Sequence, residues 1–354
     1  MPVLRVPSFL LVLLVVSLSA AASRAGAQPA GTLNIYSARH YPSDEALYAG
    51  FTQATGIRIQ RVDADDAGIL ARLKAEGSAS PADVVLLVDA SRLWRAQADG
   101  LFLPVKSAVL EAAIPPTLRA AAEAGGGTAW FGLSTRARVV VYDKARVKRE
   151  EVDTYEELAD PRHKGRVCLR SGSHPYNLSL FGALVEHLGA ERTEAWLKGV
   201  VANLARAPKG GDTDQIRAVA SGECAIALTN TYYLARLMRS NRPEDKAVAD
   251  TVGVVFPNQS SWGTHLNVAG GAVARHAKNV PAAVKFLEYL ASPAAQAQFA
   301  DGNNEWPAAR GVSFDNPALK AMTGGGFKAE VLPAAAIGAQ QARVQQMLDR
   351  VGLR

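Results

Sequence analysis

Cysteine is scarce in this 354-residue chain, which contains only Cys168 and Cys224. Two thiolates are too few for the usual structural zinc site, so a cysteine-bound metal is disfavoured. Each cysteine begins a short apolar run that is typical of a buried strand. In an oxidising compartment a cysteine pair tends to form a disulfide, and neighbouring strands would bring these two together. We therefore predict a Cys168–Cys224 bridge.

Long hydrophobic stretches are also lacking. The apolar run at residues 9–18 is too short to span a bilayer, and no later run has the length and apolarity of a membrane helix. The run follows Arg5 and precedes Ala-Gly-Ala at residues 25–27, which is the pattern of a signal peptide and its cleavage site. No cysteine follows it, which disfavours a lipid anchor. The sequence predicts a signal peptide over residues 1–27 and a protein that is exported to the periplasm and not membrane-embedded.

Strong charge of either sign is absent. The formal net charge is +6, and loss of Arg5 and Arg24 with the signal peptide reduces it by two, to +4. This charge is too weak to indicate a nucleic-acid partner. The sequence also lacks the H-E-x-x-H and G-x-S-x-G motifs and a close carboxylate pair on a clear element. An exported enzyme is therefore disfavoured, and we expect a protein that binds rather than catalyses.

The mature chain is long enough for two domains. Its 327 residues, which are 354 less the 27 of the signal peptide, are too many for one ordinary core. Strands are predicted at residues 33–37, 57–62 and 84–87, and helices at 43–55 (with Ser43 as N-cap), 67–76, 92–98 and around 154–158. This alternation indicates an α/β fold with a mostly parallel sheet in the first half.

The later strands suggest that the chain leaves the first domain and returns to it. We expect an N-terminal lobe of residues 28–133 plus about 264–310. The C-terminal lobe would comprise residues 134–263 plus about 311–354. Such a path leaves hinge strands between two lobes, with a cleft between them.

The residues Asn230-Thr231-Tyr232-Tyr233 follow a short apolar run and precede a good helical sequence, which Asn230 or Thr231 can cap. At the start of a helix, neighbouring side chains lie about 100° apart, so both phenols can lean toward one point. Tyr41, with Arg39 and His40, and Tyr176 also lie between a predicted strand and a predicted helix, where α/β folds place ligands. The alternative is that these rings pack against a core and leave their hydroxyls in water.

Several phenols around one point would suit a hard, highly charged cation. A free phenol has a pKa of about 10, so only a strong Lewis acid would hold several of them deprotonated near neutrality. Ferric iron is the obvious candidate, since three phenolates balance its charge. A fourth phenolate would leave the site negative, and Arg39 and Arg136 are candidates to offset that excess.

A set of motifs carries a resemblance to a known family. The chain resembles the periplasmic ferric-ion-binding proteins of the tyrosine-rich type, which are the substrate-binding components of iron ABC transporters. The matching pieces are Tyr36-Ser37-Ala38-Arg39-His40-Tyr41, Ser134-Thr135-Arg136-Ala137-Arg138-Val139, Tyr142-Asp143-Lys144, Ser171-Gly172-Ser173 with Tyr176-Asn177, Asn230-Thr231-Tyr232-Tyr233, Gly263-Thr264-His265-Leu266-Asn267 and Gly302-Asn303-Asn304-Glu305-Trp306-Pro307. They span almost the whole mature chain in the family's order.

The resemblance implies a type II periplasmic-binding-protein fold, in which two lobes are hinged by strands. It implies Fe³⁺ held by Tyr41, Tyr176, Tyr232 and Tyr233. The alternatives for His40 are a fifth ligand, a donor to a phenolate, or a side chain that points to solvent. Arg136 resembles the family's anion-contacting arginine, so it either contacts carbonate or another synergistic anion, or balances charge.

Carboxylates near the site have less defined roles. Other members of the wider family use a carboxylate from the first lobe, but Asp63, Asp65 and Asp66 match that position poorly and are not assigned. Glu305 is a candidate for a carboxylate that orients an imidazole or an arginine by accepting its hydrogen bond.

The expected function is capture of ferric iron in the periplasm and delivery to an inner-membrane ABC permease, by a protein expected to be monomeric. The first rival is binding of an oxyanion or a small organic anion by Arg39, Arg136 and helix N-termini, which predicts binding without a metal. An exported enzyme is the second rival. The third is an iron sensor or sequestering protein with the same site and another partner.

Overall fold

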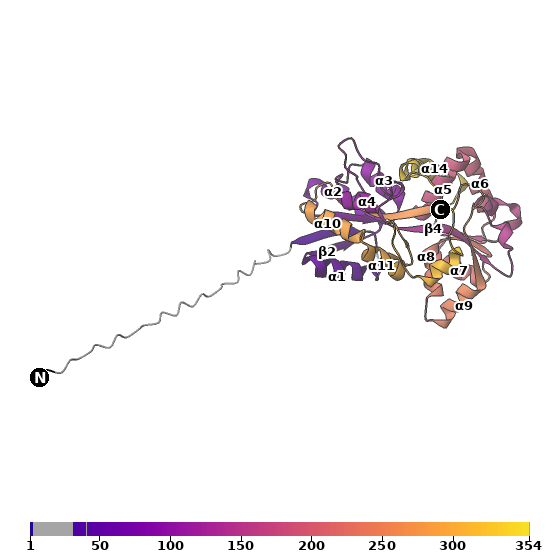
Figure 1. Ribbon diagram of the computed structural model, residues 1–354. Helices are drawn as coiled ribbons and strands as arrows, with labels where there is room; N and C mark the ends of the chain where they lie inside the picture. Colours follow the sequence, from indigo (N-terminus) through magenta and orange to yellow (C-terminus); the bar gives the residue numbers. More distant parts are fainter. Residues whose placement is uncertain (3–30, 40, 354) are drawn as a thin grey trace.

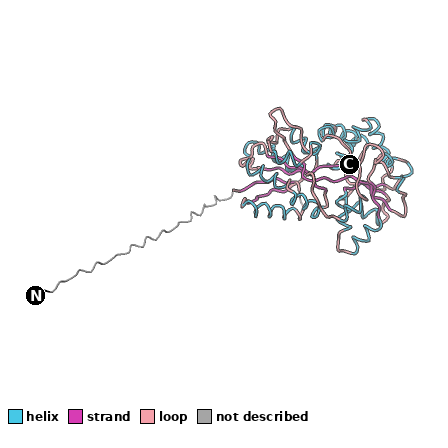
Figure 2. The backbone as a smooth tube through the Cα atoms, viewed as in Figure 1, coloured by secondary structure: helices cyan, strands magenta, loops and turns pink. Residues whose placement is uncertain are grey.

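The computed structural model describes residues 1–2, 31–39 and 41–353. The signal peptide predicted over residues 1–27 therefore lies almost wholly outside the described residues. Figure 1 shows two α/β lobes side by side, with strands running through the middle of both and helices on their outer faces. Figure 2 shows the same layering, with the strands in magenta and the helices in cyan. The prediction of a two-lobed α/β fold is confirmed.

The strands form one sheet with the order β2-β1-β3-β8-β4-β6-β5, while β7 and β9 also pair with β4. Their bounds are β1 Thr32–Ser37, β2 Arg58–Asp63, β3 Val84–Leu87, β4 Phe131–Asp143, β5 Val167–Cys168, β6 Ile226–Asn230, β7 Val252–Val255, β8 Leu266–Val273 and β9 Trp306–Pro307. The α-helices are α1 Asp44–Thr55, α2 Asp66–Glu76, α3 Ala90–Ala98, α4 Ala108–Ala113, α5 Pro175–Leu188, α6 Ala190–Ala202, α7 Asp212–Ala220, α8 Thr231–Met238, α9 Pro243–Thr251, α10 Val280–Leu290, α11 Pro293–Asn303, α12 Pro317–Thr323, α13 Ala334–Ala339 and α14 Gln341–Val351.

The first lobe follows the predicted alternation of strands and helices. β1 pairs in parallel with both β2 and β3, and the four apolar residues of β3 are all buried. The later helices α10 and α11 return to this lobe and pack with α1, as the orange and indigo ribbons of Figure 1 show. Their apolar faces share one core with β1 and β3, including Phe51, Phe286 and Phe299. Segments far apart in sequence thus complete the first lobe.

Two long strands, β4 and β8, connect the lobes. β4 pairs with β8 from Phe131 to Ala137, and then with β6 from Arg138 to Tyr142. Because the first half of β4 lies in one lobe's sheet and the second half in the other's, its middle residues sit at the junction. The side chains of Arg136 and Arg138 therefore leave the strand on one face, near both lobes.

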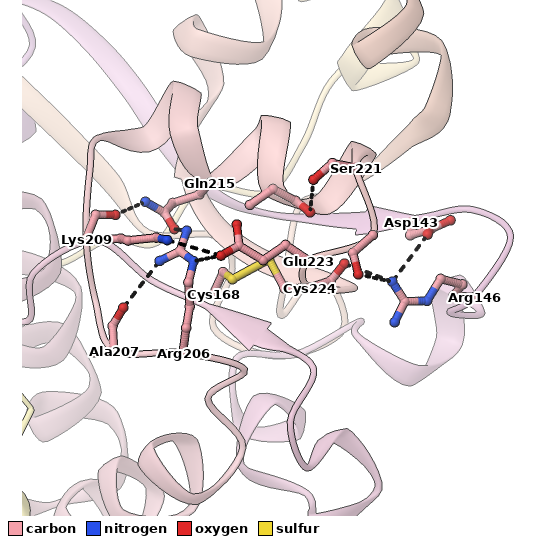
Figure 3. Close-up of a disulfide and its surroundings, with 12 residues drawn as sticks. Asp143, Arg146, Cys168, Arg206, Ala207, Lys209, Gln215, Ser221, Glu223 and Cys224 are labelled. Atoms are coloured by element: carbon pink, nitrogen blue, oxygen red, sulfur yellow. Dashed lines mark hydrogen bonds and ion pairs between the residues drawn. A yellow bond between two sulfur atoms is a disulfide. The ribbon is translucent and has the colours of Figure 1, made fainter.

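In the second lobe, β5 pairs in parallel with β6, and a disulfide joins Cys168 to Cys224. These cysteines form the pair that the sequence predicts. Figure 3 shows the bridge between charged neighbours, with Glu223 paired to Arg206 at 2.9 Å. The bridge closes a long loop of chain that ends just before β6, the strand that leads to α8. It thereby restrains the unfolded chain and fixes the base of that strand.

Two local expectations need correction. Ser43 occupies the N-cap position of α1 but does not cap it; its hydroxyl is hydrogen-bonded to Asn303 of α11 instead. The helix expected around residues 154–158 is a single 3₁₀ turn, Glu156–Ala159, because Pro161 follows closely and disfavours helical backbone before it. Among the described residues, none of the helices has the length and apolarity needed to cross a membrane.

Candidate metal centre

Tyr232 and Tyr233 stand in the first turn of α8, directly after the buried strand β6. The predicted strand-to-helix turn is confirmed. Asn230 occupies the N-cap position, yet its side chain does not cap the helix and instead accepts a hydrogen bond from Arg138 Nη1 at 3.3 Å. The two phenol rings stack with centroids 4.1 Å apart. Tyr232 is fully buried and Tyr233 half-buried, so the pair reaches from the protein interior toward its surface.

Tyr176 lies near the start of α5, where Pro175 begins the helix. His174 is the N-cap residue, and its Nδ1 accepts the backbone N–H of Tyr176 at 3.3 Å. The imidazole also packs edge-on against the Tyr176 ring, with centroids 4.5 Å apart. The hydroxyl oxygens of Tyr176 and Tyr232 lie 3.2 Å apart and share a hydrogen bond. His174 therefore holds the start of α5 so that Tyr176 meets Tyr232.

Tyr41 reaches the cluster from the other lobe, in the loop between β1 and α1. Its ring packs edge-on against Tyr232, with centroids 5.9 Å apart and an interplanar angle of 82°. Phenols from both lobes are thus brought together in one place, which we call the tyrosine cluster (Tyr41, Tyr176, Tyr232 and Tyr233). His40, the residue before Tyr41, lies outside the described residues.

Burial favours the neutral form of these phenols. It raises the pKa of Tyr176 and of Tyr232 well above the ordinary value, and the neighbouring phenols raise both further. The pKa of Tyr41 is raised first by burial and then by the nearby Glu305 carboxylate. Without a metal ion among them, these three side chains stay protonated near neutrality. A strongly charged cation is therefore needed to convert them to phenolates.

Arg136 lies against this cluster as a buried cation. Its side chain is 0% exposed, and the guanidinium carbon is 5.3 Å from the centroid of the Tyr176 ring. None of its three nitrogens has a hydrogen-bond partner among the described residues. The nearest carboxylate oxygen, Glu305 Oε1, is 4.0 Å from Nη1. Burial opposes the charge, but Tyr176, Glu305 and Tyr41 outweigh it and raise the pKa of Arg136, so it stays charged.

Arg39, the other predicted cation, has firm partners. It donates to Asp44 through Nε at 2.7 Å and Nη2 at 3.1 Å, and to Glu305 through Nη2 at 3.2 Å. Glu305 Oε2 also accepts the Ser134 hydroxyl at 2.8 Å. Glu305 thus fixes an arginine, as the sequence suggests. Arg39 still lies 4.9 Å from the centroid of the Tyr41 ring, so it positions that phenol while its charge is already paired.

A second buried network lies behind Tyr176 and could not be found from the sequence. Asp212, at the start of α7, accepts from Arg138 at 2.5 Å and from Arg170 at 3.2 Å. Arg170 in turn lies 5.2 Å from the centroid of the Tyr176 ring. No periodic pattern or short motif joins these three residues, since they are far apart in sequence. Only the helix N-terminus at Asp212 offers a local signal.

His265, Asp65 and Asp66 have structural partners. His265 contacts Glu330 and also the Ser179 hydroxyl, at 3.2 Å, away from the tyrosines. Asp65 caps α2 by accepting from Gly68 at 2.7 Å, and Asp66 accepts from Val88 at 3.0 Å. Within the described part of the chain, no group of three or more histidine, cysteine or acidic residues could hold a metal ion. The tyrosine cluster is therefore the candidate centre.

Comparison with known proteins places this geometry in a family. Residues 46–323 match the family described as bacterial extracellular solute-binding protein. Iron uptake protein A1 of Synechocystis sp. is 47% identical over 320 residues, which cover 90% of this chain and 87% of that protein.

Solved structures agree with the sequence comparison. A Trichodesmium protein (IdiA, or FutA) in complex with iron and citrate is 47% identical and has a TM-score of 0.84, covering 92% of this chain and all of that one. The ferric binding protein from Campylobacter jejuni is 38% identical, with a TM-score of 0.85 over 91% of this chain and 100% of that one. This chain therefore belongs to the bacterial extracellular solute-binding proteins.

Proposed function

We propose that this protein binds ferric iron between its lobes, through the phenolates of Tyr41, Tyr176, Tyr232 and Tyr233. The observation that carries the proposal is the buried guanidinium of Arg136. It has no hydrogen-bond partner among the described residues and lies beside Tyr176. Its nearest carboxylate, Glu305, lies 4.0 Å away and also pairs with Arg39, so the buried charge of Arg136 is only partly compensated. Deprotonation of the surrounding phenols by a bound cation would supply the missing negative charge.

The buried charges around the cluster support four phenolates rather than three. Arg39 and Arg136 are matched in number by Asp44 and Glu305, which are their neighbours. Arg138 and Arg170 share the single carboxylate of Asp212, which leaves one positive charge over. Four phenolates around Fe³⁺ would carry one net negative charge. These seven side chains and the iron site would together be neutral, which is the least costly state in a low-dielectric interior.

The fifth position and the anion follow from the same charge balance. We propose His40 as the fifth ligand, because a neutral imidazole keeps the site neutral. The alternative is carbonate or another synergistic anion held by Arg136, whose Nε, Nη1 and Nη2 are all without hydrogen-bond partners in the described structure. A singly charged anion there would require that one phenol remain protonated, and a doubly charged carbonate would require two. These two arrangements therefore differ in the number of protons released on binding.

The proposed role is carriage of iron through the periplasm to an inner-membrane ABC permease, by a monomer. A curated relative from Serratia marcescens, 27% identical, is named a Fe(3+)-binding periplasmic protein. Lobes of residues 28–133 with about 264–310, and of 134–263 with about 311–354, would close on iron about β4 and β8. Ligands from both lobes give the closed form its higher affinity, which is what shifts the population toward closure.

A visible absorption titration tests the proposal. Metal-stripped protein is titrated with ferric citrate, alongside Tyr232→Phe and, as a matched control, Tyr289→Phe on the outer helix α10. Phenolate-to-iron charge transfer should give a broad visible band that saturates at one iron per chain, weakens in Tyr232→Phe and persists in Tyr289→Phe. If the folded wild-type protein gives no band, the iron proposal is wrong and binding of an oxyanion or small organic anion becomes the leading function.

A further inference from the structure

The short helix α13 lies where the lobes meet and packs against both of them. On one side it contacts α3 of the first lobe, and on the other it contacts α5 of the second. The next helix, α14, shares the core of the second lobe with α5 and α6, through Val344, Met347 and Leu348. Figure 1 shows α3 and α5 at this junction, with α14 beside α5. The segment is thus anchored in the second lobe, and α13 reaches across to the first.

The contact with the first lobe is a glycine packed under a tryptophan. Gly338 of α13 lies against the ring of Trp94 in α3. A β-carbon on Gly338 would lie only 2.5 Å from Cε3 and 2.6 Å from Cδ2 of that ring. Carbon atoms in ordinary contact are about 3.5–4.0 Å apart, so the position has room for glycine alone. The first lobe and α13 therefore fit together closely.

The side of α13 that faces α5 is packed as closely. A β-carbon on Gly182 of α5 would lie 2.9 Å from the backbone oxygen of Ile337 and 3.2 Å from its Cγ2. Gln340, directly after α13, donates to Glu186 of α5 at 2.6 Å. These contacts stay within the second lobe. They fix α13 to the helix whose first turn carries Tyr176.

Hydrogen bonds extend the contact between the lobes toward the strands that connect them. Gln341, the first residue of α14, donates through Nε2 to the hydroxyl of Ser91 in α3. Ser91 is fully buried and donates in turn to Asp89, through its backbone N–H at 3.0 Å and through its hydroxyl. Asp89 also accepts from Asn267 of β8 at 2.6 Å. Gln341 is therefore linked through two residues to a strand about which the lobes would move.

The position of α13 is also close to the tyrosine cluster. Ala334, the first residue of α13, and Tyr233 both pack against an apolar cluster of the first lobe that includes Val88 and Trp130. Tyr176 belongs to the same apolar cluster. The start of α13 and the two tyrosines thus meet the first lobe together, as parts of one surface that forms when the lobes close.

We propose that α13 is a latch that holds the two lobes closed before iron binds. Arg136 forms no hydrogen bond with the described residues, so it adds none to the metal-free closed form. Trp94 and Gln341 supply contacts between the lobes that need no iron. A larger closed fraction raises the apparent affinity for a ligand held by both lobes in proportion to that fraction. The effect on iron rests on the function proposed above, whereas the shape of the metal-free protein does not.

Small-angle X-ray scattering of metal-free proteins tests the latch. Neighbouring glutamines give a matched pair, because Gln341→Leu removes a bond to the other lobe and Gln340→Leu removes one within its own. Wild type and Gln340→Leu should match the scattering curve calculated from this structure. Gln341→Leu should have a larger radius of gyration, and Trp94→Ala a larger one still. If Trp94→Ala and Gln341→Leu scatter as Gln340→Leu does, or if wild type is itself more extended than this structure, the latch is wrong.

Glycine substitutions test the same contact by adding an atom. Gly338→Ala forces a methyl group against the Trp94 ring and should open the metal-free protein. The control is Gly199→Ala, whose β-carbon would lie 2.7 Å from that of Ala159 inside the second lobe. This control should lower the free energy of unfolding and leave the radius of gyration unchanged. Opening by both variants would show that any local clash separates the lobes, and would overturn the proposal.

Iron binding gives the second readout. If the closed fraction falls from near one to about one fifth, Gly338→Ala and Trp94→Ala should bind ferric iron roughly fivefold more weakly, and Gly199→Ala as wild type does. Added iron should return both open variants to the compact scattering curve. Open variants with wild-type affinity would overturn the link between the latch and iron. If wild type binds no iron, the function proposed above fails, and the metal-free scattering still decides whether α13 is a latch.

Discussion

Arg136 and Arg138 stand two residues apart on β4, face the same side of the strand and are both buried, yet they have opposite surroundings. Both terminal nitrogens of Arg138 are bonded, Nη1 to Asp212 at 2.5 Å and Nη2 to Asn177 at 2.7 Å. No nitrogen of Arg136 has a hydrogen-bond partner in the described residues. A buried arginine with both terminal nitrogens bonded can be explained by the fold, whereas one with no bonded nitrogen calls for another partner.

The comparison separates two uses of buried charge. Arg138 bonds to residues of α5 and α7 within one lobe, so its interactions contribute to the free energy of unfolding. Arg136 faces phenols from both lobes, which are neutral in the metal-free protein. Its charge should therefore contribute to the affinity for iron. Changes around Arg136 should therefore affect iron and leave the metal-free protein stable, while changes around Arg138 should do the reverse.

The largest expected effect is the dependence of iron binding on pH, which arises on the Arg136 side alone. Burial raises the pKa of Tyr176, Tyr232 and Tyr41, so these phenols are protonated in the metal-free protein and lose protons to bind iron. Affinity should therefore rise with pH and fall as pH is lowered, by about one factor of ten per ligating phenol for each pH unit. A pH-stat measurement of protons released on iron binding checks this.

The matched variant for that experiment is Tyr232→Phe. Wild type should release about one proton more than the variant, after the protons exchanged by the citrate donor are subtracted. Equal release by the two proteins would show that Tyr232 does not give up its proton. After any proton lost by bicarbonate is subtracted, a total of four protons from wild type would favour His40 in the fifth position, and fewer than four would favour a synergistic anion.

The next largest effect is on stability and concerns Arg138. Arg138→Met should lower the free energy of unfolding of the metal-free protein by about 3–5 kcal/mol, because it removes the closer partner of the buried Asp212 carboxylate. Urea unfolding followed by circular dichroism measures this. The control is Arg136→Met, which should lower the same free energy by less than about 1 kcal/mol, since Arg136 has no hydrogen bond to lose and loss of its partly compensated buried charge can only offset the change. Equal destabilisation by both would show that Arg136 also serves the fold.

Arg136→Met should have its main effect on iron. We expect the affinity for ferric iron to fall by about a hundredfold, or about 2.7 kcal/mol, because the excess negative charge of four phenolates then loses its nearest buried cation. Competition with citrate, followed by the visible band, measures the change. Arg138→Met, examined under conditions where it is folded, should lose much less affinity. If Arg136→Met binds iron with wild-type affinity, the proposal that Arg136 offsets the phenolate charge is wrong.

The strand-to-helix turns that carry the tyrosines are predictable because their signals are local. A short apolar run followed by Asn230 and Thr231 predicts the start of α8, and the structure has it there. The side chain of Asn230 does not cap this helix, because its amide oxygen is taken by Arg138. The amide oxygen of Asn230 accepts from a donor that is near in space but 92 residues earlier in the sequence, Arg138 of β4.

The charge network is not predictable, because its members are joined only by the fold. Arg39 is a reasonable candidate to offset phenolate charge on sequence grounds, but Glu305, 266 residues away, and Asp44 already pair with it. The pairing of Arg170 with Asp212 could not be predicted for the same reason. Salt bridges have no sequence period, unlike helices and strands, so the sequence indicates that arginines lie near the tyrosines without indicating which of them is already neutralised.

The smallest expected effect comes from Arg136→Lys, which separates the charge of Arg136 from its shape. Lysine keeps a positive charge but loses the planar fork that holds an oxyanion through two bonds. If Arg136 only balances phenolate charge, the variant should bind iron within about fivefold of wild type, a difference of about 1 kcal/mol. If Arg136 instead holds carbonate, Arg136→Lys should lose nearly as much affinity as Arg136→Met. Titrations in carbonate-free buffer with and without added bicarbonate distinguish the two, since only an anion-dependent site gains affinity from bicarbonate. Because the buried side chains leave one positive charge for four phenolates, we expect bicarbonate to have no effect and Arg136→Lys to stay close to wild type.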